Sequence, residues 1–102
     1  MTVPRKNPLG LIMNMVEAMK LTVTYAYADL VFVDHNAFLL QMVENPQVIN
    51  LYFNQESEIT ARAGLAAALI LHGAENGLRV MYKGLFNLAP ESNDTLKITF
   101  TK

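Results

Sequence analysis

The sequence predicts an α+β domain in which two helices pack on a mainly antiparallel sheet, in the order α-β-β-β-α-β-β-β. Two segments, about 8–20 and 57–76, carry apolar residues at helical spacing. The other segments alternate apolar and polar residues with a period of two, and short turn-forming stretches separate them. These observations indicate two helices and five to seven strands.

Length and composition favour one globular domain and limit its partners. The chain has 102 residues, which predicts a single domain at 8–102 behind a polar arm at 1–7. Apolar residues make up 52%, which excludes a disordered chain, and a net charge of −1 lacks the positive footprint of a nucleic-acid binder. The absence of cysteine is consistent with a cytoplasmic protein. No apolar run approaches the roughly 20 residues of a membrane span, so a membrane is not an expected partner.

The first predicted helix has apolar residues on two adjacent faces. It begins at Asn7-Pro8, because asparagine caps free N–H groups and proline suits the first helical position. The row expected to face the core consists of Leu9, Ile12, Met13, Val16 and Met19. A second apolar row beside it consists of Leu11, Met15 and Ala18.

Strand-like segments follow this helix at 21–28, 30–33, 38–43 and 48–53. In the first segment Leu21, Val23, Tyr25 and Tyr27 alternate with smaller residues, which predicts that these four share one face of the sheet. Asp34-His35-Asn36-Ala37 is typical of a tight hairpin turn, because aspartate bonds to nearby backbone and asparagine tolerates a positive φ.

The second predicted helix has almost no polar face. It follows the polar segment 54–58 and ends before Gly77, a residue that suits the left-handed position after a helix. The expected core row is Ile59, Ala63, Ala66, Ala67, Ile70 and Ala74. A second row has the small residues Ala61, Gly64 and Ala68, and a third has Leu65, Leu69 and His72. Strands are expected after it at about 78–82, 85–88 and 95–101.

The two halves of the chain are similar enough to suggest a degenerate αβββ duplication. The segment 21–25 is similar to 78–82, and 49–53 is similar to 96–100. Short alternating strands also resemble one another by chance, which is the competing interpretation. The order of elements is similar to that of small secretion-chaperone-like domains, which are dimeric adaptors, although no sequence motif accompanies this likeness.

The apolar excess on both helices predicts self-association. A helix on a sheet buries a stripe about 100° wide, and both helices exceed this width. A chain of this size cannot cover both sides of both helices, so an exposed apolar patch is expected, which marks an interaction site. We therefore predict a non-enzymatic interaction module that forms a homodimer and also accepts a protein or peptide partner. The predicted interface residues are Leu11, Met15, Leu65, Leu69 and Leu71.

A small-molecule pocket between helices and sheet, near Met13 and Tyr25, is the alternative function. Asp34 and His35 add the one cluster of carboxylate and imidazole at which a general base or a ligand site is conceivable, although both residues also suit the turn itself.

Metal, cofactor and nucleophilic chemistry are not expected. His72 and Glu75 share one side of the second helix, but a metal site needs three or four ligands and the chain has two histidines and no cysteine. No glycine-rich phosphate loop and no serine in a nucleophile elbow are present. The sequence therefore predicts neither an enzyme nor a cofactor.

Overall fold

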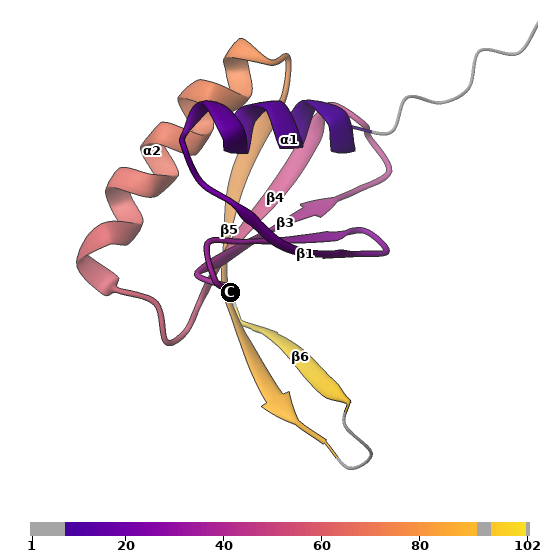
Figure 1. The fold of residues 1–102 in the computed structure, drawn as a ribbon, viewed down its shortest axis with the longest axis vertical. Helices are drawn as coiled ribbons and strands as arrows, with labels where there is room; N and C mark the ends of the chain where they lie inside the picture. Colours follow the sequence, from indigo (N-terminus) through magenta and orange to yellow (C-terminus); the bar gives the residue numbers. More distant parts are fainter. Residues whose placement is uncertain (1–7, 92–94, 102) are drawn as a thin grey trace, which may run out of the picture.

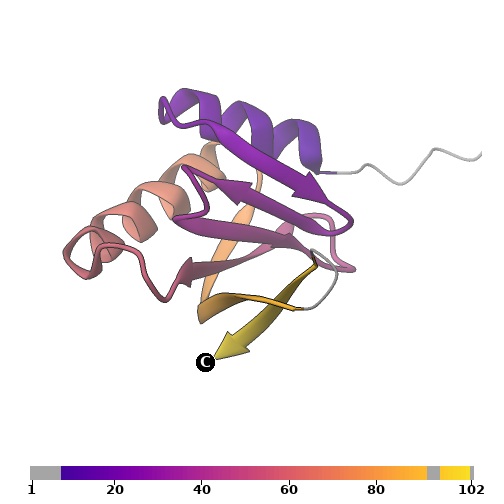
Figure 2. The same cartoon turned by 60° about the horizontal axis from the view of Figure 1, so that its bottom comes forward.

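Two helices lie over one face of a curled sheet of six strands (Figures 1 and 2). This computed structural model describes residues 8–91 and 95–101, so the predicted arm at 1–7 lies outside it. The elements are α1 (Leu9–Ala18), β1 (Val23–Tyr27), β2 (Leu30–Val33), β3 (Phe38–Met42), β4 (Val48–Asn54), α2 (Ile59–Glu75), β5 (Arg79–Pro90) and β6 (Leu96–Thr101). The predicted α+β class is confirmed.

The strands follow chain order across the sheet, from β1 at one edge to β6 at the other. Each neighbouring pair is antiparallel except β4 and β5, which are parallel because α2 carries the chain back to the same end of the sheet. The sheet is therefore mixed, with one parallel pair that the sequence did not predict.

The observed order is α-ββββ-α-ββ, and it differs from the predicted order after each helix. Four strands follow α1, at the positions of the four strand-like segments, whereas the predicted order counted three strands there. The segments expected as separate strands at 78–82 and 85–88 form the single strand β5. The pair Lys83-Gly84 does not break the strand, because the register with β4 only shifts there: Leu51 pairs with Tyr82 and Tyr52 with Gly84.

This order does not contain two equal αβββ halves. The segment 21–25 runs into the edge strand β1, whereas 78–82 runs into β5, which lies between β4 and β6. The order on which the likeness to secretion-chaperone-like domains rested is therefore not the order in the structure.

The main core fills the space between the helices and the sheet. Strands contribute every second residue to it, and α1 contributes Ile12, Met15 and Val16. Val16 and Ile12 confirm the predicted core row of α1, but Met13 is exposed and Met15 takes its place. The buried members are Ile12, Met15, Val16, Val31, Val33, Phe38, Leu40, Ile49, Leu51, Phe53, Leu69, Leu78 and Val80.

Helix α2 turns a different face to this core from the one predicted. Leu69 and Gly73 are buried, and Leu65 and Ala66 pack against the core. The expected core row, apart from Ala66, is exposed: Ile59, Ala63, Ala67, Ile70 and Ala74. A close approach at Gly73 explains this rotation, because a Cβ added there would lie 2.6 Å from Val80 Cγ2 and 3.6 Å from Met15 Sδ.

The opposite face of the sheet carries a second apolar cluster. Its buried members are Leu30, Phe32, Leu39, Tyr52 and Phe86, with Leu88 and Ile98 packed against them. A bulge between Val23 and Tyr25 places Val23 on the helix side, while Tyr25 pairs with Phe32 and faces the second cluster. The prediction that Val23, Tyr25 and Tyr27 share one face is therefore wrong.

Strands β5 and β6 curve beneath this second face (Figure 2). β6 pairs with residues 85–90 of β5, the part that lies mostly beyond β4. Ring contacts between the hairpin and the central strands hold the curvature, with centroids 5.9 Å apart for Phe32 and Phe86 and 4.5 Å apart for Tyr52 and Phe100. The sheet is thus a half-barrel whose concave side faces away from the helices.

Candidate functional site

The outward face of α2 exposes large apolar side chains. Ile59 is 72% exposed, Leu71 60% and Ile70 47%, although each is a large hydrophobic residue. Small residues fill the surface between them. We call this surface the α2 face, and it consists of Ile59, Ala63, Gly64, Ala67, Ile70, Leu71 and Ala74.

No ionic side chain covers the α2 face. Arg62 is the only Lys, Arg, Asp or Glu between Ile59 and Ala74, and its guanidinium turns back toward the loop that precedes the helix. Its Nε donates to Ser57 Oγ at 3.0 Å, and its Nη2 donates to the carbonyl oxygens of Ser57 at 3.0 Å and Asn54 at 3.2 Å. The arginine therefore closes the β4–α2 loop and leaves the helix surface uncharged.

Two glycines in α2 differ in whether the fold of the single chain requires them. Gly73 is required by the fold, because its missing Cβ leaves room for Val80 and for the Leu78 carbonyl. Gly64 has no such reason within this chain, because a Cβ added there would meet nothing within 4 Å. A glycine inside an exposed helix costs about 1 kcal/mol relative to alanine. Gly64 therefore leaves a notch in the middle of the α2 face, and no contact within the chain offsets its cost in helix stability.

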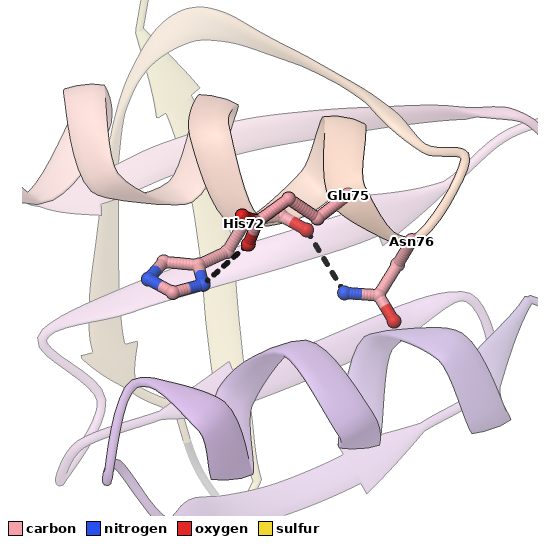
Figure 3. A network of polar contacts seen from close by, with 3 residues as sticks. All are labelled: His72, Glu75 and Asn76. Atoms are coloured by element: carbon pink, nitrogen blue, oxygen red, sulfur yellow. Dashed lines mark hydrogen bonds and ion pairs between the residues drawn. The ribbon is translucent and has the colours of Figure 1, made fainter.

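Another set of polar contacts lies at the C-terminal end of α2 (Figure 3). His72 Nδ1 lies 3.2 Å from Glu75 Oε1, and Asn76 Nδ2 donates to the His72 carbonyl at 2.9 Å. These contacts satisfy groups in the last turn, where helix carbonyls lack intrahelical partners. Residues 8–91 and 95–101 contain no group of three or more His, Asp or Glu side chains placed to hold a metal ion.

The predicted interface residues do not share one surface. Met15 and Leu69 are fully buried, so neither can contact another molecule in this fold. They are buried because α1 and α2 pack together near Gly73, which brings both side chains into the core. Leu65 is half-buried, Leu11 is exposed on α1, and Leu71 belongs to the α2 face.

Sequence reasoning assigned most of the α2 face to the core. Ile70, Ala67 and Ala63 were expected to be buried because they follow helical spacing, but the neighbouring row follows the same spacing. The signal that distinguishes the rows is Gly73: the helix face that contains it can lie closest to the sheet.

The predicted ligand residues are also dispersed. Met13 lies on α1, whereas Tyr25 faces the concave side of the sheet, and the core fills the space between helices and sheet where a pocket was expected.

Asp34 and His35 lie in the β2–β3 turn, with Asn36 beside them. All three have positive φ, of 55°, 55° and 65°, and the His35 N–H donates to Thr24 Oγ1 at 2.8 Å. Aspartate, asparagine and histidine are the residues that tolerate this conformation best. The turn accounts for these residue types without a catalytic role.

Comparison with protein-family models, with curated proteins and with solved structures finds no match for this chain. In the described part of the chain neither helix is both long and apolar enough to cross a bilayer. The functional argument therefore proceeds from the geometry of the surfaces above.

Proposed function

We propose that this protein is a non-enzymatic interaction module that self-associates through the α2 face. The observation that supports the proposal is the uncharged apolar surface of α2, from which Arg62 is withdrawn. Exposed apolar patches of this kind mark interaction sites. The occupant we propose is the α2 face of a second copy of the chain, related by a twofold axis.

Self-complementary shape favours a second copy over another partner. If two α2 helices cross antiparallel at Ala67, helical spacing places Leu71 of one copy opposite Gly64 of the other, on one side of the contact line. On the other side, the same operation places Ile70 opposite Ala63. Each large residue therefore meets a small one, and the notch at Gly64, which the single chain does not explain, receives a side chain.

Electrostatics agree with the antiparallel arrangement. The positive end of each helix dipole would lie beside the negative end of its partner, and the uncharged surface has no ion to desolvate. The proposed dimer buries the apolar side chains of the α2 face and leaves the concave side of the sheet open.

Mass measurement of purified protein tests the proposal. Light scattering coupled to size exclusion is expected to give twice the chain mass of 11.4 kDa. Ala67→Glu places two carboxylates at the centre of the proposed interface, where an uncompensated buried charge costs roughly 3 kcal/mol, or more than a hundredfold in dissociation constant. Gly64→Leu fills the notch without a charge and is also expected to yield monomers.

Leu96→Glu is the matched control, because Leu96 is an exposed leucine on β6, away from both helices. It introduces the same charge and is expected to leave the dimer intact. Far-UV circular dichroism checks that all three variants keep the fold. A monomeric wild type, or a dimer that survives both α2 substitutions, would contradict the proposed interface.

A further inference from the structure

Asn76 and Gly77 form the junction between α2 and β5, and no other asparagine of the chain precedes a glycine. An asparagine side chain reacts with the backbone nitrogen of the next residue, and this reaction is easiest before glycine, because no Cβ shields the nitrogen. Asn76 is half-buried and Gly77 is exposed, and a Cβ added to Gly77 would meet nothing within 4 Å. Water therefore reaches the pair in the folded chain.

The reaction at this junction consumes water and releases ammonia. The Gly77 nitrogen forms a bond to Asn76 Cγ while the Cγ–Nδ2 bond breaks, and the proton of that nitrogen leaves with the amide group as ammonia. Water then opens the resulting cyclic imide. Attack of water at Cγ gives aspartate at position 76. Attack at the backbone carbonyl carbon gives isoaspartate, in which the chain runs through the side-chain carbons.

Hydrogen bonds of the folded chain hold both reacting groups. The Gly77 N–H donates to the Ala74 carbonyl at 3.1 Å, and Asn76 Nδ2 donates to the His72 carbonyl at 2.9 Å (Figure 3). The Leu78 N–H donates one turn back at 2.8 Å, which completes a Schellman motif with Gly77 at a φ of 75°. The Gly77 nitrogen must lose its proton and meet Cγ, so its own hydrogen bond and that of the Asn76 amide have to break first.

The last turn of α2 can open without unfolding of the whole chain. Helix ends fray, and such local openings need less free energy than global unfolding. This turn is anchored at Leu78, which is buried in the main core. The folded chain therefore reacts at the rate of the open chain multiplied by the fraction of molecules in which the turn is open.

The product does not restore the closed turn. An aspartate carboxylate accepts hydrogen bonds but has no donor for the His72 carbonyl. It also adds a negative charge next to Glu75 at the negative end of the helix dipole, which is unfavourable. Isoaspartate lengthens the backbone shortly before the buried Leu78. A modified chain therefore has an open turn more often than an unmodified one.

We propose that Asn76 is a deamidation site whose rate is set by opening of the last turn of α2, and that its modification weakens the junction between α2 and β5. The reacting groups and the turn that protects them all belong to one chain. Neither step requires a second copy.

Mass spectrometry of the full chain during incubation at neutral pH measures the rate. The fragment that contains residue 76 is expected to change from amide to acid, with isoaspartate among the products. In urea, which opens the turn in every molecule, the rate is expected to be at least about tenfold higher than in native buffer. Asn76→Gln keeps a carboxamide, but its longer side chain closes an imide poorly, so this control is expected to remain unmodified in both conditions.

Two variants that loosen the turn test whether its opening sets the rate. Gly73→Ala places a Cβ against Val80, and Leu78→Ala removes the side chain that anchors the turn. Each is expected to raise the native rate by roughly tenfold or more and to leave the rate in urea unchanged. Leu96→Glu, on β6, is the control and is expected to change neither rate.

Asn76→Asp tests the effect of the product. Hydrogen exchange of the Gly77 and Leu78 amides, measured by NMR, is expected to be about tenfold faster in this variant, because one hydrogen bond contributes roughly that factor. The amides of β3, far from the turn, are expected to exchange as in the wild type.

Each part of the proposal has a result that would overturn it. No modification in urea, or equal rates in urea and in native buffer, would show that the site or its protection does not exist. An unchanged native rate in both Gly73→Ala and Leu78→Ala would show that opening does not set the rate. Unchanged amide exchange in Asn76→Asp would show that the product does not weaken the junction.

Discussion

Replacing Gly73 with alanine tests how closely α2 approaches the sheet. The new Cβ would lie 2.6 Å from Val80 Cγ2 and 3.2 Å from the Leu78 carbonyl oxygen. Val80 is 5% exposed, and a β-branched side chain has few alternative rotamers, so it cannot swing aside easily. The Gly73 carbonyl also accepts N–H donors from Asn76 at 2.9 Å and Leu78 at 2.8 Å, which restrains the backbone.

The magnitude follows from two opposing effects. Overpacking a core costs about 1–3 kcal/mol, and this contact belongs at the upper end because both neighbours are restrained. Alanine recovers about 1 kcal/mol of helix propensity. Gly73→Ala is therefore expected to lower the free energy of unfolding by about 2 kcal/mol, which corresponds to roughly 8 °C in Tm for a domain of this size.

Urea unfolding followed by circular dichroism measures this difference. Gly64→Ala is the control in the same helix: its Cβ meets nothing, so at the lowest usable protein concentration it is expected to stabilise the chain by about 0.5–1 kcal/mol. Val80→Ala removes the clashing methyl group, so the double variant with Gly73→Ala is expected to be at least about 1 kcal/mol more stable than the two single effects predict. A neutral Gly73→Ala, or strict additivity with Val80→Ala, would refute the close approach.

Two further substitutions test the loops at β4–α2 and β2–β3. Arg62→Lys is expected to lower the free energy of unfolding, measured in urea, by about 1 kcal/mol, because a single ammonium cannot reproduce the hydrogen bonds that the guanidinium makes to Ser57 and Asn54. A change near zero would show that these bonds do not hold the loop. His35→Val is expected to lower the free energy of unfolding by about 1–2 kcal/mol, because a β-branched residue is strained at a φ of 55°. His35→Gly is expected to be neutral or stabilising, because glycine adopts this φ without strain. Equal stability of the two variants would contradict strain as the cause.

The local pattern of residues predicted the helices and most strands. α1 and α2 lie within the predicted segments 8–20 and 57–76, and the strand-like segments 30–33 and 48–53 match β2 and β4 closely. These predictions held because amphipathic spacing and turn residues act over a few neighbours along the chain. The β2–β3 turn was recognised for the same reason: its residue types suit positive φ.

The candidate surfaces were harder to predict. The sequence indicated an apolar excess, and Leu71 was correctly placed among exposed residues, but Met15 and Leu69 were not. The face on which Tyr25 lies was predicted wrongly, because the bulge after Val23 turns its side chain to the other face of the sheet. A one-residue register shift reverses every side chain that follows, and alternation alone does not reveal it.

Composition and periodicity were enough to establish an α+β domain with more apolar helix surface than one sheet can cover. They could not choose which face of α2 lies inward, because a helix that is apolar on nearly every side has no hydrophobic preference for one face. Steric fit made that choice: Gly73 permits contact with Val80, and the rotation that follows exposes Ile70 and Leu71. Fit of this kind depends on atoms that are distant in sequence, and therefore exists only in the folded chain.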